Sequence, residues 1–292
     1  MTDRVEIFEV GPRDGLQNEA RIIPTQDKIA LIDALSAAGF RRIEVASFVS
    51  PKWVPQMADG AEVLGGITRA PGVSYAALVP NERGLERAIA AKPDEIAVFA
   101  SASEGFSKAN LNCTIEESFA RFAPVVAGAQ AAGLRVRGYV SCVTDCPFDG
   151  ATPPDTVADV AARLHALGCY EVSLGETLGK ARPEAVAAML GAVCDVVPAD
   201  SLAGHFHDTA GRALDNIDVA LQAGLRVFDA SVGGLGGCPY APGAAGNVAT
   251  EAVMEFVTAR GGETGLDPDK VALAADMARA LRKGEGRTHE HA

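Results

Sequence analysis

The sequence predicts an α/β fold, a closed (β/α)8 barrel of the TIM type with an additional C-terminal helix. Short β-rich apolar runs alternate with longer helical patterns along the chain, eight such runs are present, and no long linker separates two halves. A length of 292 residues is one that such barrels reach as a single unit. We therefore expect one barrel domain over residues 1–292, with a disordered tail from about residue 283 to 292.

The eight expected strands are apolar, β-rich runs at residues 5–10, 42–46, 73–79, 95–100, 135–140, 171–174, 202–205 and 227–232. Helical periodicity lies between them at 25–38, 81–91, 115–132, 155–167, 183–196 and 211–223. Glycine follows several of these helices just before the next strand, which is a common way for a helix to end. A final helix is expected at 268–281, packed on the outside of the barrel.

A doubly wound open sheet is the alternative architecture. Its dinucleotide-binding form carries a GxGxxG motif directly after a strand, at the start of a helix. Here the glycines at 233, 234, 236 and 237 come after the last strand and are followed by Cys238 and Pro239. The barrel is therefore favoured, and in such barrels the reactive residues lie at the carboxyl ends of the strands.

Composition narrows the classes of partner. The net charge is −12 and no long basic run is present, so nucleic acid and anionic membranes are not expected partners. A local arginine or a bound cation can still attract an anionic small substrate. The chain has no signal-peptide pattern and no run of eighteen apolar residues, and its six cysteines are scattered, so we expect a cytoplasmic protein.

The first two strands lead into charged residues. Gly11 and Pro12 end the first strand, and Arg13, Asp14 and Gln17 follow on the expected active face. Arg13 and Asp14 could pair with each other instead of acting on a ligand. Glu44 stands inside the apolar second strand and would face the barrel interior or pair with a basic group, for which Arg13 is the natural candidate.

The fifth and sixth strands end in weaker signals. Cys142 and Cys146 have i, i+4 spacing without a second pair, so packing is favoured over a zinc site. Glu176 and Thr177 follow the sixth strand, where they are placed to contact a substrate or to support residues that do.

The strongest pattern is the pair His205 and His207 at the end of the seventh strand. Spacing of i, i+2 in a strand puts both imidazoles on one face, although histidines at a strand end are also common without a ligand. With Asp14 and Asn247 they make a possible set of one carboxylate, two imidazoles and an amide oxygen. Such a set favours Mg²⁺ or Mn²⁺ over zinc.

A glycine-rich segment follows the eighth strand and carries the single thiol of Cys238. Six glycines and two prolines between residues 233 and 246 predict a long mobile loop, neither helix nor strand, that acts as a lid. A helix is expected after it, with Asn247 near its start.

Four segments carry a resemblance to the hydroxymethylglutaryl-CoA lyases, members of the metal-dependent lyase and synthase barrels. They are 9–19 (EVGPRDGLQNE), 47–57 (SFVSPKWVPQM), 137–142 (RGYVSC) and 234–243 (GLGGCPYAPG), and the resemblance runs from about residue 5 to 281. It implies cleavage of 3-hydroxy-3-methylglutaryl-CoA to acetyl-CoA and acetoacetate, a reaction of leucine degradation and ketone-body formation. It also implies an acyl-CoA as the partner, and we expect a homodimer or higher homo-oligomer.

The resemblance also implies roles for single residues. Asp14, His205, His207 and Asn247 would hold the divalent cation. Catalytic roles are implied for Arg13, which would stabilise the enolate of the thioester, for Glu44, which would support Arg13, and for Cys238, which would donate a proton. The base would be His205 or Asp14, and the substrate-binding residues would be Arg13, Gln17, Glu176 and Thr177.

Three positions depart from the usual family pattern: Glu176 where an aspartate is usual, Ala252 where an acid is usual, and Phe206 between the two histidines. None of them removes an implied ligand or the thiol, but they leave the acyl group open. A 3-hydroxy-3-alkylglutaryl-CoA or citramalyl-CoA lyase is the first alternative. A condensing synthase of the same superfamily and a non-catalytic acyl-CoA-binding protein are the others.

Overall fold

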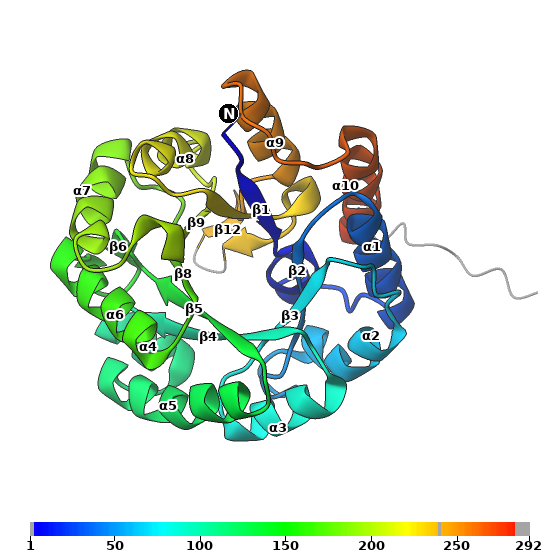
Figure 1. The fold of residues 1–292 in the computed structure, drawn as a ribbon, viewed down its shortest axis with the longest axis horizontal. Coiled ribbons are helices and arrows are strands. Elements are labelled where there is room, and N and C mark those ends of the chain that lie inside the picture. The colour runs from blue at the N-terminus through cyan, green and yellow to red at the C-terminus, as the bar shows by residue number, and fades with distance from the viewer. Residues whose placement is uncertain (1–2, 239–240, 284–292) are drawn as a thin grey trace, which may run out of the picture.

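A computed structural model describes residues 3–238 and 241–283, with the backbone alone for residues 237–238 and 241–245. Eight parallel strands close into a barrel in the order β1-β10-β9-β8-β5-β4-β3-β2 (Figure 1). These strands are β1 (Glu6–Glu9), β2 (Arg42–Ser47), β3 (Ser74–Leu78), β4 (Glu95–Ser101), β5 (Arg135–Ser141), β8 (Glu171–Glu176), β9 (Leu202–Phe206) and β10 (Val227–Ala230). The predicted α/β barrel is confirmed, and each predicted strand is present.

The helices form a ring around the barrel (Figure 1). They are α1 (Thr25–Ala37), α2 (Gly60–Gly66), α3 (Glu82–Ala91), α4 (Glu104–Leu111), α5 (Ile115–Ala131), α6 (Pro154–Leu167), α7 (Pro183–Cys194), α8 (Ala213–Gln222), α9 (Thr250–Ala259) and α10 (Pro268–Lys283). The additional C-terminal helix is α10, which packs beside α1. Arg21, which precedes α1, donates to the backbone oxygen of Leu281 in α10 at 3.1 Å. The predicted tail beyond it lies outside the described residues. None of the described helices combines the length and the apolar character that crossing a bilayer requires.

Two of these helices, α2 and α4, have no counterpart in the sequence-based prediction. α2 has only seven residues, three of them glycine, and such a segment carries almost no periodic apolar signal. α4 has only eight residues, and its main sequence signal is a single N-cap. The side chain of Ser103 accepts a hydrogen bond from the backbone amide of Phe106. α2 is the short helix between β2 and β3, whereas α4 is an additional helix between β4 and α5.

The glycine-rich segment after β10 also differs from the prediction, which excluded helix and strand. It contains a short 3-10 turn η4 (Val232–Gly234) and two antiparallel strands, β11 (Gly237–Cys238) and β12 (Ala241–Ala245). Positive φ angles at Gly233, Gly234 and Gly236 turn the chain sharply, and the flanking backbone is then free to pair. The mobility and lid function of this segment stay predictions.

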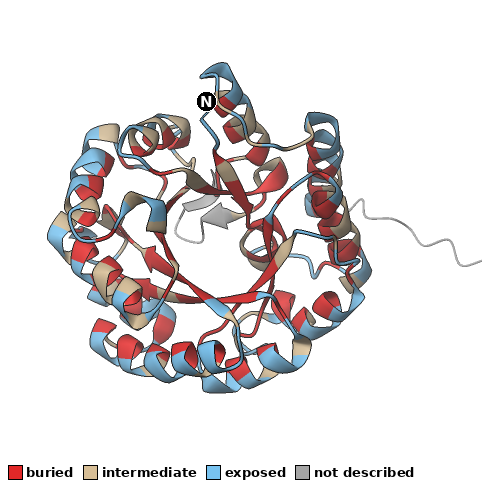
Figure 2. Ribbon diagram, viewed as in Figure 1, coloured by how far each residue is buried: buried red, intermediate tan, exposed pale blue. Residues whose placement is uncertain are grey.

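The apolar core lies between the barrel and the helices, where Figure 2 shows buried residues on the strands and on the inner sides of the helices. The outward-pointing residues of the strands fill it, such as Ile43 and Val45 in β2 and Val136 and Val140 in β5. This layer removes the apolar side chains from water and holds the strands at fixed register, so the strand ends form a rigid platform.

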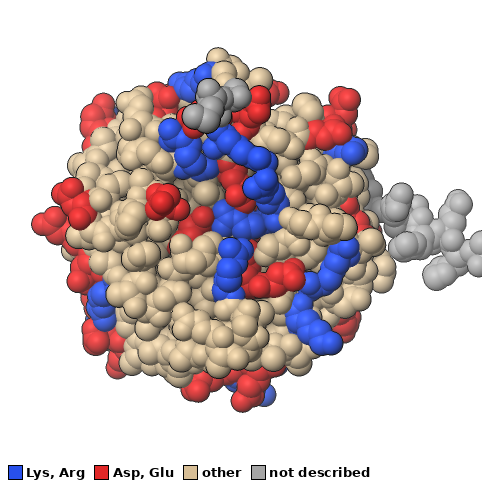
Figure 3. All heavy atoms as spheres, in the orientation of Figure 1, with Lys and Arg blue, Asp and Glu red and all other residues tan. Residues whose placement is uncertain are grey.

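The inside of the barrel carries charge in place of the usual branched apolar residues. Arg137 binds Glu171 at 2.6 Å, Glu171 binds Arg42 at 2.9 Å, and Arg42 binds Glu6 at 2.6 Å, all near the amino ends of the strands. Figure 3, seen from the side where the chain begins, shows a band of basic and acidic side chains across the centre of this face. These paired charges fill this end of the barrel interior.

Candidate active site

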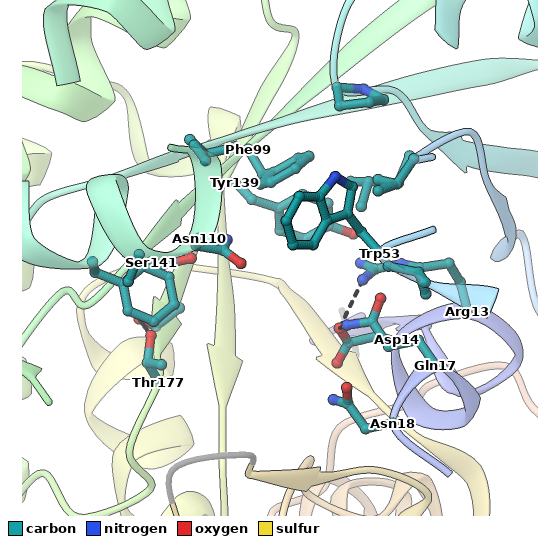
Figure 4. A pocket seen from close by; sticks show the side chains of 18 of the residues that line it. Arg13, Asp14, Gln17, Asn18, Trp53, Phe99, Asn110, Tyr139, Ser141 and Thr177 are labelled. Carbon is teal, nitrogen blue, oxygen red and sulfur yellow. Dashed lines mark hydrogen bonds and ion pairs between the residues drawn. The ribbon is translucent and has the colours of Figure 1, made fainter. Parts of the chain in front are cut away.

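A pocket of about 720 Å³ lies at the carboxyl ends of the strands. Its lining residues come from the ends of many strands, and include Arg13, Asp14, Gln17, Trp53, Leu78, Phe99, Tyr139, Ser141, Thr177, His205, His207 and Asn247. Figure 4 shows Arg13, Asp14 and Gln17 along one side of the pocket and Ser141 and Thr177 on the other. Most of the residues singled out from the sequence therefore meet in one place, as the barrel architecture predicts.

Asp14, His205 and His207 form a group that can hold a metal ion. Each offers one ligand atom, and these atoms all lie within 4.8 Å of one another. The Nε2 atoms of the two histidines are 3.3 Å apart, because alternate residues of a strand point to the same side. One carboxylate and two imidazoles suit a divalent cation such as Mg²⁺ or Mn²⁺, so the side chains present fit the predicted cation.

The second nitrogen of each imidazole has its own partner. Nδ1 of His205 lies 3.0 Å from Oδ2 of Asp229, and Nδ1 of His207 lies 2.7 Å from the backbone oxygen of Thr177. A proton on Nδ1 in both rings leaves Nε2 free as a ligand. Burial, aided by the charge of His205, lowers the pKa of His207 to about 4, so this ring is neutral at physiological pH.

Asn247 completes the predicted ligand set and lies near the start of a helix, as predicted, because α9 begins at Thr250. It also forms an isolated antiparallel bridge with His207, which was not predicted. Its Nδ2 donates to Oδ2 of Asp14 at 2.8 Å. The bridge brings the end of the glycine-rich segment beside β9, and Asn247 thereby lies against two of the other three predicted ligands.

Arg13 is held by two carboxylates at once. Its Nε donates to Oε2 of Glu44 at 2.7 Å, and its Nη1 donates to Oδ1 of Asp14 at 2.7 Å. Both pairings considered from the sequence are thus present, and Figure 4 shows the contact between Arg13 and Asp14. The hydroxyl of Tyr139 donates to the same Oε2 of Glu44 at 3.2 Å, and its ring lies 5.8 Å from the guanidinium carbon of Arg13.

These pairings determine the charge of each group. Burial raises the pKa of Glu44, while Arg13 acts against that change. Burial alone would raise the pKa of Asp14 as well, but Arg13 and His205 outweigh it and lower that pKa. Arg13 stays charged, because Glu44 and Asp14 outweigh the effect of its burial and raise its pKa. The pocket thus contains a fixed positive charge beside an ionised carboxylate.

A tight turn after β1 places Arg13 and Asp14. The backbone oxygen of Val10 accepts hydrogen bonds from the amides of Arg13, Asp14 and Gly15, within a short π-helix η1 (Gly11–Gly15). A Cβ at Gly15 would lie 2.7 Å from both the side chain of Leu235 and the hydroxyl of Ser231. Only glycine allows this approach, so the turn packs directly on the segment after β10.

The carboxylate of Glu9 connects this turn to two neighbouring segments of the chain. It accepts hydrogen bonds from the amide of Gly11 at 2.8 Å, the amide of Val232 at 3.0 Å and the hydroxyl of Thr250 at 2.6 Å. Burial raises the pKa of Glu9 to about 7, although these three donors act to lower it. One buried side chain therefore joins the ends of β1 and β10 and the start of α9.

The predicted substrate-binding residues separate into two groups. Gln17 lines the pocket and its Nε2 donates to Oδ1 of Asp14 at 3.3 Å, and Thr177 lines the pocket near His207. Glu176 is fully buried and is not one of the lining residues, because in β8 it points to the side opposite Gly175 and Thr177. Of the two roles predicted for Glu176, this placement favours support of the segment after β8.

The thiol of Cys238 lies outside the described side chains, although its backbone belongs to β11. Gly236 locates the segment nearby: a Cβ there would lie 3.0 Å from Nδ2 of Asn247. The loop therefore reaches the candidate metal ligands two residues before Cys238. The other predicted cysteine pair, Cys142 and Cys146, is buried in an apolar cluster with Phe106, as expected for packing.

Sequence reasoning missed Asp229, whose carboxylate contacts His205. An acid in the strand residues Val227–Ala230 was the available signal, since a buried carboxylate requires a partner. Its partner could not be found from the sequence, because it depends on the pairing of β9 with β10, which puts Asp229 opposite His205. The pocket residue Trp53, 84% exposed, was missed as well.

Comparison with known proteins agrees with this geometry. The family model described as HMGL-like matches residues 4–278. The chain is 52% identical to the hydroxymethylglutaryl-CoA lyase of Pseudomonas mevalonii, over 97% of this chain and 95% of that protein. It is 56% identical to a 3-hydroxy-3-isohexenylglutaryl-CoA/hydroxymethylglutaryl-CoA lyase of Pseudomonas aeruginosa, over 90% and 88%. The solved structure of the HMG-CoA lyase from Brucella melitensis matches with a TM-score of 0.95 and 62% identity, over 96% of this chain and 99% of that one.

Proposed function

The chain belongs to the HMGL-like family, and we propose that it is a hydroxymethylglutaryl-CoA lyase, which cleaves 3-hydroxy-3-methylglutaryl-CoA to acetyl-CoA and acetoacetate. The observation that carries this proposal is the adjacency of two sites in one pocket. A cluster fit for a divalent cation is formed by Asp14, His205 and His207, and the guanidinium of Arg13 lies directly beside it. A retro-aldol cleavage of a thioester needs both, because charge changes at the hydroxyl and at the thioester oxygen together.

The cation site is proposed to take Mg²⁺ or Mn²⁺, with Asp14, His205, His207 and Asn247 as ligands. A divalent cation bound there would supply Lewis-acid polarisation of the tertiary hydroxyl and so lower its pKa. The base that removes the hydroxyl proton is proposed to be His205 or Asp14, since both lie in the pocket at that point. Loss of this proton forms the carbonyl of acetoacetate while the neighbouring carbon-carbon bond breaks.

Arg13 is proposed to act at the other end of that bond. The electron pair of the broken bond moves onto the thioester oxygen of the departing acetyl-CoA unit, which becomes an enolate. A fixed guanidinium stabilises negative charge that appears only as the bond breaks. Glu44 supports it by binding both Nε and Nη2, which directs Nη1 toward Asp14 in the pocket.

Cys238 is proposed to deliver a proton to the enolate carbon from the glycine-rich segment. This role rests on the resemblance of that segment to the lyases and on the contact of Gly236 with Asn247. Gln17 and Thr177 are proposed to contact the acyl portion of the substrate, since both line the pocket.

The deciding experiment incubates the purified protein with Mg²⁺ or Mn²⁺ and a panel of thioesters. The panel contains 3-hydroxy-3-methylglutaryl-CoA, a 3-alkyl homologue and citramalyl-CoA, and the products are identified by mass spectrometry. We expect acetyl-CoA and acetoacetate from the first, with activity lost on chelation and restored by either metal. Full activity in the presence of a strong chelator would contradict the cation's role, and cleavage of citramalyl-CoA alone would replace the proposed substrate.

A second substrate is favoured by one feature of the pocket. Leu78 and Phe99 belong to one apolar cluster at its wall, and the indole of Trp53 lines it as well. Such a surface suits a 3-alkyl group longer than methyl. The Pseudomonas aeruginosa relative carries the isohexenyl thioester in its name, so the homologue in the panel should be the isohexenyl one.

The homo-oligomeric state and the cytoplasmic location stay predictions. Light scattering of the purified protein tests the first of them.

A further inference from the structure

We propose that Asp229 is a positioning residue for His205, and that Arg137 and Ser173 hold Asp229 in the orientation that this requires. The inference rests on the cation site of the proposed function. It concerns side chains of the barrel interior to which the proposed reaction assigns no role.

The register of the barrel brings the two side chains together. Asp229 in β10 is the parallel partner of His205 in β9, so both side chains point into the barrel at the same height. Oδ2 of Asp229 lies 3.0 Å from Nδ1 of His205, while Nε2 of the same ring faces His207. A carboxylate at Nδ1 keeps the proton there and turns the Nε2 lone pair toward the cation site.

Asp229 itself cannot rotate. Arg137 binds both of its oxygens, with Nη2 to Oδ1 at 2.7 Å and Nη1 to Oδ2 at 3.1 Å, and the hydroxyl of Ser173 donates to Oδ2 at 2.7 Å. A bidentate guanidinium fixes the plane of a carboxylate as well as its position. The direction from Oδ2 to His205 is therefore fixed by three strands, β5, β8 and β10.

Arg137 is in turn held by two aromatic rings and a second carboxylate. Its guanidinium carbon lies 4.2 Å from the ring centre of Phe8 and 4.9 Å from that of Tyr139, and its Nε donates to Glu171 at 2.6 Å. Its side chain is almost fully buried. A charged group that is buried and paired in this way keeps one conformation. Arg137 therefore fixes the orientation of the Asp229 carboxylate, and Asp229 fixes the orientation of the His205 ring.

A purely structural ion pair between Arg137 and Asp229 is the competing explanation, and metal affinity separates the two. The experiment measures the Kd of Mn²⁺ by electron paramagnetic resonance, without substrate, for the wild type, Asp229→Asn and the control Glu95→Gln. Glu95 is equally buried inside the barrel and binds Tyr170 at 2.6 Å and Arg135 at 3.2 Å, but it lies away from the His205 contact. Thermal melting of each variant reports the structural cost.

We expect Asp229→Asn to bind Mn²⁺ about 10 to 100 times more weakly, as is typical when the outer partner of a ligating histidine is lost. The control should keep the wild-type Kd within about twofold even if it melts earlier. A folded Asp229→Asn protein with the wild-type Kd would overturn the proposal.

A second measurement applies even if Asp229→Asn does not fold. Nitrogen NMR of the metal-free wild type, labelled at histidine and kept at a pH where the ring is neutral, reports the tautomer of His205; loss of its signals in His205→Gln assigns them. A proton on Nδ1 supports the proposal, and a proton on Nε2 overturns it. A wild type that binds Mn²⁺ but cleaves no thioester of the panel would overturn the proposed function and leave the positioning role standing.

Discussion

Nε of Arg13 donates to Oε2 of Glu44 at 2.7 Å, although 31 residues separate them in the chain. The turn after β1 supplies the arginine and the middle of β2 supplies the carboxylate, so the contact exists only once the two strands are paired.

Arg13→Met should lower kcat by several orders of magnitude, because it removes the positive charge at the thioester oxygen. Mn²⁺ affinity should change far less, since Arg13 is not a predicted ligand. Arg69→Met is the matched control: Arg69 pairs with Asp94 on the surface and should keep wild-type kcat. Turnover of Arg13→Met within tenfold of the wild type would contradict the assignment of Arg13.

Glu44→Gln should lower the free energy of unfolding by about 3 kcal/mol, because it leaves a buried arginine with one carboxylate fewer. It should also lower kcat, but by less than Arg13→Met does. A double-mutant cycle in kcat tests whether the two act together. If Glu44 acts through Arg13, adding Glu44→Gln to Arg13→Met costs little more; fully additive losses would assign Glu44 an independent role.

His205→Ala and Asp14→Ala should each abolish tight Mn²⁺ binding and lower kcat by several orders of magnitude, since each removes a predicted ligand. His165→Ala is a suitable control, because His165 lies in the last turn of α6, away from the pocket. Isothermal titration with Mn²⁺ gives the comparison. Undiminished binding in both ligand variants would place the cation elsewhere.

Cys238→Ser should cause a large loss of kcat while Mn²⁺ and thioester binding persist, because a serine hydroxyl is a much weaker acid than a thiol. Cys194→Ser serves as the control, since Cys194 ends α7 and is only partly buried. Loss of Mn²⁺ binding in Cys238→Ser would instead make this thiol a ligand.

Glu9→Gln should remove a pH dependence of stability. The pKa of Glu9 is about 7 in the folded protein and near 4.5 when unfolded, so the folded state holds a proton that the unfolded state loses between these values. Wild-type stability should therefore fall relative to Glu9→Gln as pH rises from 4.5 to 7, by at most about 3 kcal/mol, and then stay level. Urea denaturation at several pH values measures it; a constant difference would contradict the raised pKa.

The fold was predictable because the spacing of the apolar residues and the positions of helix-ending glycines indicate the same elements along the chain. Eight apolar runs separated by helical patterns with terminal glycines leave few architectures other than the barrel. The cost of burying an isolated carboxylate predicted that Glu44 faces the interior or pairs with a basic group such as Arg13, and the alternation of side chains put His205 and His207 on one face. His205 and His207 are close in the sequence, and Glu44 lies on the strand next to the one that Arg13 follows.

What could not be predicted depends on register. Asp229 meets His205 because β10 and β9 pair with these two residues level, and a shift of two residues along either strand would separate them. The bridge between Asn247 and His207 also depends on how distant segments pair, so the sequence indicated only the helix that follows Asn247. Glu176 was predicted at this strand end with two possible roles, and its burial in β8 opposite Gly175 favours support over direct contact.

Arg13 and Asp14 are consecutive residues on one short π-helix, and Nη1 of Arg13 donates to Oδ1 of Asp14 at 2.7 Å. One peptide unit joins their backbones, while contacts with other elements orient the two side chains: Glu44 binds Arg13, and Asn247 binds Asp14. A displacement of this turn would therefore carry the proposed enolate-stabilising group and a proposed cation ligand together, so that both halves of the proposed reaction depend on one point of the backbone.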